Sequence, residues 1–188
     1  SEIYGGGQSG YCPESTPKIV PPITTVRLEY AIAKLAVETA IINSCKSRGL
    51  SCSIIRPFNV AGPRQSPKGG FVLPRFIQQA ARNLPITVFG DGSAIRAFTH
   101  VSDMVRAYYL ALNKGKPGEL YLIGSDLIFS MKQILQKLIK LSNKKIKYKV
   151  VKSRIRPTEL NYLIGDITKF KKLTKWKYRK NINDILLD

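Results

Sequence analysis

The sequence predicts an α/β fold with a parallel sheet, on three observations. Short apolar runs typical of strands alternate along the chain with stretches whose apolar residues recur at helical intervals. The run over residues 52–59 has the apolar character of an inner strand in a parallel sheet. At 188 residues, the chain is long enough for one substantial core with a small second lobe.

The first part of the chain predicts a loop and then one long helix. Residues from Gly5 to Pro22 are rich in glycine and proline, which indicates a long loop. A helix should begin at Thr24 or Thr25, because either hydroxyl can cap it. It should continue to about Arg48, where Gly49 supplies a stop.

Within this helix, Tyr30 and Lys34 are four residues apart and therefore share one face. The predicted core stripe consists of other positions: Leu28, Ile32 and Leu35. A nearby ammonium favours the phenolate form of a tyrosine and prepares it for proton transfer. Taken alone, the pair is more typical of an amphipathic helix with a lysine directed to solvent.

The rest of the chain predicts alternating strands and helices. Expected strands or extended segments cover residues 52–59, 86–89, 96–101, 119–123 and 146–151. Expected helices cover residues 71–83, 102–112 with Ser102 as cap, a stretch capped by Ser130, 167–173 and 182–187. Their predicted inward positions include Met104, Tyr108, Ala111, Ile134, Leu135, Leu138 and Leu141. The first of these strands would place Phe58 and Asn59 at the carboxyl edge of the sheet, where open α/β sheets bind ligands.

The formal net charge of +19 is the strongest feature of the composition, and lysines crowd residues 132–180. Such a charge is typical of nucleic-acid binding. These lysines, however, alternate with apolar residues over 145–150 and 169–173, as on solvated faces of a strand and a helix. We favour solvated faces; a polyanion-binding surface and a patch that helps to hold an anionic nucleotide both stay open.

The cysteines and the single histidine do not predict a metal site. Cys12, Cys45 and Cys52 are an odd set without metal-ligand spacing, so neither zinc nor a disulfide framework is expected. His100 is expected to pack or to hydrogen-bond locally rather than to act as a base. No apolar run approaches the roughly 20 residues that cross a bilayer, and no signal-peptide pattern is present, so a cytoplasmic location is expected.

Several motifs follow one another in order: Ser1-Glu-Ile-Tyr-Gly5, Tyr30-x-x-x-Lys34, Arg56-Pro-Phe-Asn59, Gly62-Pro-Arg-Gln65, Phe71-Val-Leu-Pro74, Ile86-Thr-Val-Phe-Gly-Asp-Gly92, Arg96-Ala-Phe-Thr-His-Val-Ser-Asp103 and Arg156-Pro157. In this order they resemble the extended short-chain dehydrogenase/reductase family, in particular its NAD-dependent nucleotide-sugar epimerases, dehydratases and decarboxylases. The resemblance implies the C-terminal part of a Rossmann-type parallel sheet with a small α+β substrate-binding lobe. Residues 1–68 would belong to the NAD-binding domain and 69–188 mainly to the nucleotide-sugar lobe, with the chain interleaving the two.

The resemblance also implies roles in catalysis. Tyr30, as phenolate, would remove the proton of the sugar 4-hydroxyl during oxidation at C4, while Lys34 would hold the ribose of NAD and stabilise the phenolate. Glu2 matches an acidic residue that moves a proton in dehydratase and decarboxylase members, although a residue so near the start of the chain could equally be disordered. Pro57 and Phe58 are implied to contact the cofactor.

The implied substrate-binding residues are Asn59, Leu73, Phe89, Arg96 and Arg156. Asn59 matches a side chain that meets phosphate, and the two arginines match residues that grip the diphosphate with a planar, permanently charged fork. For Arg96, a surface salt bridge is the alternative. Leu73 and Phe89 match positions that line the base pocket, and a purely core role for both is equally open.

The strand, glycine-rich turn and helix that bind the dinucleotide pyrophosphate in this family have no counterpart in the sequence. Residues 5–10 fit G-x-G-x-x-G literally, but Pro13 and Pro17 forbid the helix that must follow such a turn. We therefore expect a truncated chain that is inactive alone, of low stability, and dependent on self-association or on a complementing N-terminal half. The usual dimer of the family makes a homodimer plausible.

A second hypothesis is a non-catalytic remnant that binds sugar nucleotides, or that uses its basic face on RNA or another polyanion. UDP is preferred over dTDP or GDP only by its frequency in the family.

Overall fold

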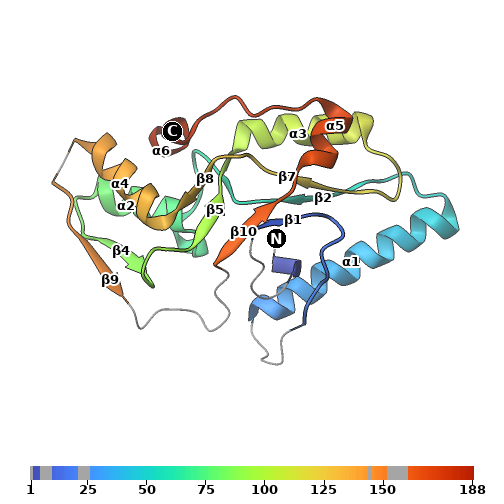
Figure 1. The fold of residues 1–188 in the computed structure, drawn as a ribbon, viewed down its shortest axis with the longest axis horizontal. Helices are drawn as coiled ribbons and strands as arrows, with labels where there is room; N and C mark the ends of the chain where they lie inside the picture. The colour runs from blue at the N-terminus through green and yellow to red at the C-terminus, as the bar shows by residue number, and fades with distance from the viewer. Residues whose placement is uncertain (1, 5–9, 21–25, 144, 152–160) are drawn as a thin grey trace.

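The computed structural model describes residues 2–4, 10–20, 26–143, 145–151 and 161–188 (Figure 1). Its helices are η1 (Glu2–Tyr4), α1 (Val26–Arg48), η2 (Pro67–Gly69), α2 (Val72–Ala81), α3 (Val101–Lys114), α4 (Met131–Ser142), α5 (Thr168–Thr174) and α6 (Ile182–Leu187), where η marks a 3₁₀ turn. Its strands are β1 (Tyr11–Cys12), β2 (Ile54–Pro57), β3 (Val60–Ala61), β4 (Ile86–Phe89), β5 (Ile95–Ala97), β6 (Thr99–His100), β7 (Leu120–Ile123), β8 (Ile128–Ser130), β9 (Tyr148–Val151) and β10 (Tyr162–Gly165).

Strand pairing is mainly parallel, which confirms the predicted α/β class. β2 pairs with β7 in parallel, from Ile54 opposite Leu120 to Pro57 opposite Ile123. β4 pairs with β9, β3 with β6, and β1 with β10, also in parallel. β10 continues in parallel onto β5, whose other neighbour, β8, is antiparallel. Between β2 and β7 the chain runs through α2 and β4, at the other end of the molecule, and then returns (Figure 1).

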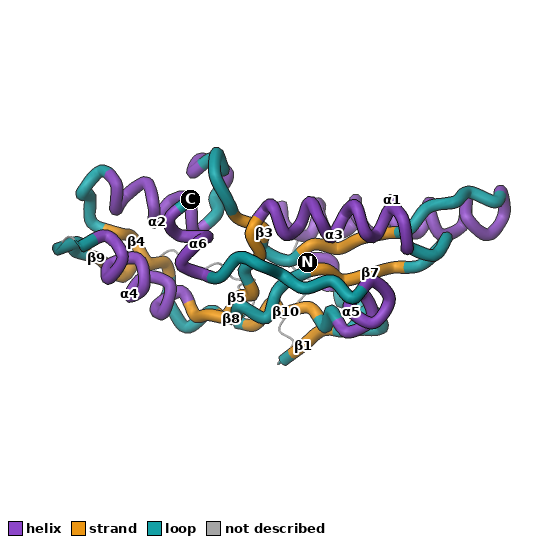
Figure 2. Tube along the Cα trace, turned by 90° about the horizontal axis from the view of Figure 1, so that it is seen from above, coloured by secondary structure: helices purple, strands orange, loops and turns teal. Residues whose placement is uncertain are grey.

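The buried apolar residues form two clusters, which occupy the two ends of an elongated molecule (Figure 2). One lies between α2, α4, α6 and β4 and includes Phe76, Ile86 and Ile134, all fully buried. The other surrounds β2, β7, α3 and α5 and includes residues from both ends of the sequence, such as Tyr4 and Phe170. Both clusters draw on residues before and after position 68, so the division at that position remains a prediction.

A buried ion pair holds α1 against β2. Nε of Arg56 donates to Oε1 of Glu38 at 2.7 Å, and a second bond joins the guanidinium to the other carboxylate oxygen. The guanidinium also donates to the hydroxyl of Tyr4 at 2.6 Å. Burial raises the pKa of Tyr4, so its hydroxyl stays protonated at neutral pH. These contacts fix the helix that carries Tyr30.

Several predicted boundaries are confirmed. α1 ends at Arg48, and Gly49 follows with φ of 66°. The strand over 86–89 and the helix over 182–187 have the predicted bounds. Ser130 caps α4 through a capping box with Gln133. The predicted caps of α1, Thr24 and Thr25, lie outside the described residues.

Other predictions were wrong at particular positions. The N-cap of α3 is His100 rather than Ser102, because the His100 side chain accepts from the Ser102 amide. The predicted loop before Pro22 contains the short strand β1, which forms its backbone hydrogen bonds with β10. The sequence analysis did not predict β10. Residues 2–4, for which the sequence analysis gave no element, form a 3₁₀ turn.

The predicted apolar stripe of α1 was also wrong. Ile32 is 48% exposed, and Leu28 and Leu35 are only half-buried. Instead, the described buried side chains of α1 are those of Ala31 and Glu38, because this helix packs against η1 and Arg56.

Elsewhere, two predicted inward faces are open to solvent. Tyr108 of α3 is exposed, and Ala107 takes its place in the core. Tyr148 and Val150 of β9 are exposed, so this strand does not bury the apolar residues that alternate with its lysines. No helix among the described residues has both the length and the apolar character of a membrane span.

Candidate functional site

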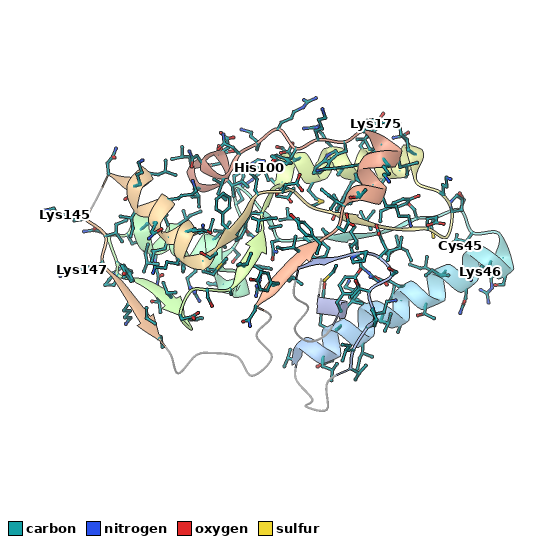
Figure 3. All side chains as sticks on the ribbon, in the orientation of Figure 1. Cys45, Lys46, His100, Lys145, Lys147 and Lys175 are labelled. Carbon is teal, nitrogen blue, oxygen red and sulfur yellow. The ribbon has the colours of Figure 1, made fainter. Side chains whose placement is uncertain are left out.

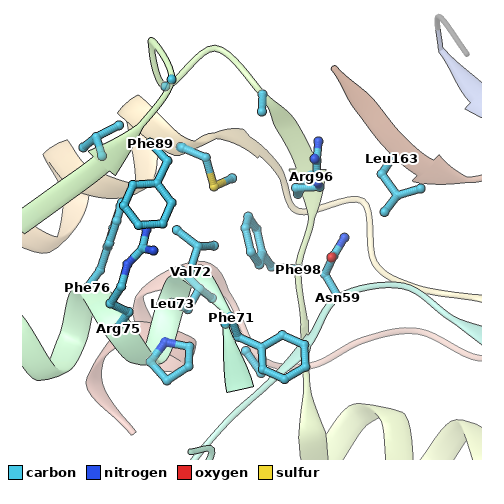
Figure 4. Close-up of a pocket in the computed structure, with 18 of the residues that line it drawn as sticks. Asn59, Phe71, Val72, Leu73, Arg75, Phe76, Phe89, Arg96, Phe98 and Leu163 are labelled. Carbon is cyan, nitrogen blue, oxygen red and sulfur yellow. The ribbon is translucent and has the colours of Figure 1, made fainter. Parts of the chain in front are cut away.

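A pocket of about 700 Å³ opens between α2, the turn from β4 to β5, and the end of the β2–β3 segment. Its wall includes Tyr30, Asn59, Leu73, Phe89 and Arg96. Figure 4 shows that Asn59 and Arg96 lie on one side of this pocket and that Leu73 and Phe89 lie on the other. Five of the sequence-predicted site residues therefore share one opening, although they come from five separate segments.

Asn59 presents a polar group that none of the described residues satisfies. Its backbone has φ of 34°, and its carbonyl accepts from the amide of Thr99 at 3.1 Å, which fixes the residue beside β6. Its Nδ2 atom is buried and, among the described residues, has no hydrogen-bond partner. An unsatisfied buried amide costs about 1–3 kcal/mol, so a ligand acceptor that reached this group would recover that cost.

Arg96 is held by backbone carbonyls. One guanidinium nitrogen donates to the carbonyl of Ile95 at 2.8 Å and to that of Asn161 at 3.5 Å. The side chain is half-buried in the pocket wall, where desolvation strengthens its attraction for an anion. A guanidinium so oriented can bind phosphate oxygens through two parallel hydrogen bonds.

The apolar side of the pocket carries an aromatic ring that an arginine supports. Leu73 is 3% exposed and belongs to the first core cluster, whereas Phe89 is half-buried. The guanidinium carbon of Arg75 lies 3.8 Å from the centroid of the Phe89 ring, within cation–π range. Arg75 also donates to the carbonyl of Thr87 at 3.2 Å. Arg75 thus holds the ring that lines the pocket, a role that the sequence analysis missed.

Tyr30 and Lys34 lie on the same side of α1. Nζ of Lys34 is 5.6 Å from the centroid of the Tyr30 ring, and Tyr30 is 54% exposed at the rim of the pocket. The lysine is exposed as well. The phenol is therefore accessible at the pocket opening, and the lysine lies beside its ring.

Of the remaining predicted site residues, Pro57 and Phe58 lie outside the pocket wall, and the side chains of the other two are not among those described. Pro57 is exposed at the end of β2, whereas the Phe58 side chain is 1% exposed in the second core cluster and packs so closely on Gly165 that a side chain there would clash. The backbone of Glu2 is in η1, but its side chain is outside the description, and so is Arg156. The roles of all four remain predictions.

His100 lies away from the pocket wall and hydrogen-bonds locally, as expected. Its Nδ1 atom lies 2.7 Å from the Ser102 hydroxyl, and Nε2 lies 3.1 Å from a carboxylate oxygen of Asp188. Within the described ranges, no three histidine, cysteine, aspartate or glutamate side chains are grouped as metal ligands.

Comparisons with known proteins show the family to which the chain belongs. Residues 1–124 match the family model of the NAD dependent epimerase/dehydratase family. The chain is 35% identical over 145 residues to UDP-N-acetyl-alpha-D-glucosaminuronate decarboxylase of Bacillus cytotoxicus, which covers 76% of this chain and 44% of that protein. It is 32% identical over 184 residues to UDP-glucuronic acid decarboxylase 5 of Arabidopsis thaliana, covering 98% and 53% respectively. The chain thus spans about half the length of these curated relatives.

The chain also matches solved structures of a nucleotide-sugar epimerase and a nucleotide-sugar dehydratase along nearly its whole length. The crystal structure of UDP-glucuronic acid 4-epimerase from Bacillus cereus, in complex with UDP-glucuronic acid and NAD, matches with a TM-score of 0.86 and 30% identity. The match covers 100% of this chain and 57% of that one. A dTDP-glucose 4,6-dehydratase from Streptomyces venezuelae, with NAD bound, matches with a TM-score of 0.83 and 25% identity, over 98% of this chain and 55% of that one. By the family-model match over most of its length, this chain belongs to the NAD dependent epimerase/dehydratase family.

Proposed function

We propose that this chain is the nucleotide-sugar-binding part of an NAD-dependent epimerase, dehydratase or decarboxylase and retains the proton-transfer pair of the reaction. The observation that carries this proposal is the shared pocket, which combines an apolar aromatic side, an arginine beside an unsatisfied amide, and a phenol at the rim. A nucleoside diphosphate sugar has the matching sequence of groups: a flat base, two phosphates and a hydroxylated ring.

In this proposal, the base lies against Phe89 and Leu73, and the diphosphate lies at Arg96 and Asn59. The sugar then extends toward Tyr30, at the N-terminal end of α1. This order is supported by the pocket wall, because Arg96 and Asn59 face the side that carries Leu73 and Phe89 (Figure 4), and Tyr30 lines the same pocket from α1. Binding of this kind fixes the orientation of the sugar before any bond changes.

Tyr30 is the proposed base. Its phenolate would accept the proton of the sugar 4-hydroxyl, and the ammonium of Lys34 would stabilise the negative charge of the oxygen. NAD, when bound, supplies the hydride acceptor for oxidation at C4. The resulting keto group would make epimerisation, dehydration or decarboxylation possible; Glu2 is the proposed proton carrier in the latter two.

The described residues fit one end of NAD and not the other. Exposed Tyr30, Lys34 and Pro57 offer a hydroxyl, an ammonium and an apolar surface that suit the nicotinamide ribose. The pyrophosphate needs successive backbone amides at a glycine turn followed by a helix. After Gly10, the chain instead enters β1. We therefore assign the proton-transfer pair to this chain and expect weak NAD binding by the chain alone.

Three further features belong to the same proposal. The favoured substrate is a UDP-sugar, because the names of several relatives specify UDP-sugars. A homodimer or a complementing N-terminal half would complete the protein, and Arg156 would add to the diphosphate site. A cytoplasmic location remains our expectation.

Calorimetric titration of the chain with UDP tests the binding proposal. Arg96→Ala should weaken UDP binding by about tenfold or more, since a charge-assisted hydrogen bond contributes about 1.5–3 kcal/mol. Arg48→Ala is the matched control, because it removes one positive charge at the exposed far end of α1. Equal affinities of both variants, or no saturable UDP binding by the wild type, would contradict the proposal.

The alternative is a remnant that binds polyanions. It is supported by the charge of +19 and by residues 147–150, at the start of β9, where exposed Lys147 and Lys149 alternate with exposed Tyr148 and Val150. An RNA titration at rising salt separates the two functions, because phosphate contacts lose affinity steeply with salt concentration. Lys147→Ala with Lys149→Ala should reduce that salt slope only if this surface binds RNA.

A further inference from the structure

Cys45 and Cys52 lie side by side at the end of α1 that is remote from the pocket. Their sulfur atoms are 3.3 Å apart, and both residues are half-buried. Figure 3 shows Cys45 near the far end of α1, well away from His100. Tyr30, at the pocket rim, is fifteen residues earlier in the same helix, which corresponds to about 22 Å along the axis.

The backbone around the two cysteines holds them together. Gly49, with φ of 66°, turns the chain after α1, and the amide of Leu50 donates back to the carbonyl of Ser44 at 3.3 Å. On the strand side, the amide of Gly118 donates to the carbonyl of Cys52 at 2.8 Å. The Cys45 thiol is also placed to donate to this carbonyl, at 3.8 Å. Several independent contacts therefore place the two sulfur atoms within reach of each other without a change of fold.

We propose that Cys45 and Cys52 form a reversible disulfide by exchange with a small disulfide such as glutathione disulfide. The Cys45 thiolate attacks one sulfur of glutathione disulfide, whose S–S bond breaks and releases one glutathione thiolate. The Cys52 thiol then loses its proton to solvent and attacks the Cys45 sulfur, which releases the second glutathione. Two cysteines are oxidised, and one glutathione disulfide is reduced to two glutathione molecules.

The third cysteine provides an internal comparison. Cys12 is 2% exposed, and burial raises the pKa of its thiol, so it should react slowly with an added disulfide. The hydrogen bond with Cys45 raises the pKa of the Cys52 thiol, which makes Cys52 a poor first nucleophile. These properties of Cys12 and Cys52 agree with a first attack by Cys45 on the added disulfide and a second attack by Cys52 on the Cys45 sulfur.

The disulfide would tie the end of α1 to the segment that enters β2. Because the closed loop is short, its expected effect is a rise of about 5 °C in Tm. Since the pair lies about 22 Å from Tyr30 along α1, the affinity for UDP should stay unchanged. Failure of the disulfide to form would therefore leave the proposed nucleotide-sugar binding untouched. Failure of UDP binding would likewise leave the disulfide proposal untouched.

Peptide mapping of the intact chain tests this proposal. The folded protein is incubated with glutathione disulfide, blocked with iodoacetamide and digested with trypsin without reduction. Cleavage after lysine and arginine separates residues 35–46, which contain Cys45, from residues 49–64, which contain Cys52. We expect these two peptides to be joined, at a mass two hydrogens below the sum of the reduced peptides, and to separate again after reduction.

Two variants test which cysteines form the joined peptides. Cys45→Ser should abolish the joined peptides and leave a slowly formed glutathione adduct on Cys52, whereas Cys12→Ser should leave the joined peptides unchanged. Glutathione adducts on both Cys45 and Cys52 without a joined product would overturn the proposal. Joined peptides that come only from a covalent dimer, separated by non-reducing electrophoresis, would overturn it as well.

Discussion

The guanidinium of Arg56 forms a two-point ion pair with the carboxylate of Glu38 in the interior of the protein. Arg56 lies in the strand that leads into Asn59, and Glu38 lies two helical turns after Tyr30. The pair therefore connects the element that carries the proposed base with the segment that carries the proposed phosphate contact.

Glu38→Ala should lower the free energy of unfolding by about 3–5 kcal/mol, because it leaves the Arg56 charge buried without its partner. Urea unfolding measures this change. Asp126→Ala, which breaks the partly exposed pair with Lys171, is the control and should cost less than about 1 kcal/mol. Similar losses in both variants would show that the interior pair does not fix α1.

Arg75→Met should weaken nucleotide binding although the residue makes no proposed contact with phosphate. The guanidinium stacks on the Phe89 ring, so its loss lets the ring rotate away from the pocket. We expect a several-fold loss of UDP affinity and a smaller loss for inorganic pyrophosphate, which lacks a base. Arg82→Met, at the exposed end of α2, serves as the charge-matched control. Equal losses for UDP and pyrophosphate would contradict the positioning role.

Acid should remove a small contribution of Glu119 to stability. The hydrogen bond from Lys169, at 2.6 Å, holds the pKa of the Glu119 carboxyl below its ordinary value. A lowered pKa in the folded state stabilises the protein above the unfolded-state pKa of about 4.5, and this contribution is lost as the pH falls through the folded-state value. In Glu119→Gln, the free energy of unfolding should therefore decrease less than in the wild type as the pH falls below about 5. The difference should be less than about 1 kcal/mol, because both groups are partly exposed.

Denaturant midpoints measured from pH 6 to pH 3 check this prediction. Glu29→Gln, in the exposed first turn of α1, is the control. A steeper dependence in Glu119→Gln than in the wild type would give the wrong sign.

The chain alone should bind NAD weakly and should self-associate. The amides that would hold a pyrophosphate are absent from the described residues that follow Gly10, and α1 exposes apolar side chains such as Ile32 and Val37. Sedimentation and NAD calorimetry measure both properties. A monomer that unfolds cooperatively and binds NAD tightly would refute this expectation.

Local patterns allowed part of the fold to be predicted from the sequence. The bounds of β4 and α6 and the Ser130 cap depend on residues within a few positions of each other. β10 could not be found in this way, because four residues without a hairpin signal became a strand only through pairing with the distant β1 and β5.

The site was predictable where spacing or the family resemblance indicates the chemistry. Tyr30 and Lys34 were found from their spacing on a helix and Arg96 from the resemblance, and the structure places them at or near one opening. The support of Phe89 by Arg75 depends on how α2 packs against β4, which the spacing of fourteen residues does not indicate. The pairing of Cys45 with Cys52 likewise depends on the turn at Gly49.

The central claim is that the pocket binds a nucleoside diphosphate sugar with its sugar toward Tyr30. A crystal structure of the chain with UDP-glucose tests it most directly. We predict phosphate oxygens at hydrogen-bond distance from Arg96 and Asn59, the uracil ring against Phe89, and the glucose ring beside the Tyr30 hydroxyl. UDP-glucose bound outside this pocket, or bound with its glucose directed away from α1, would contradict the account.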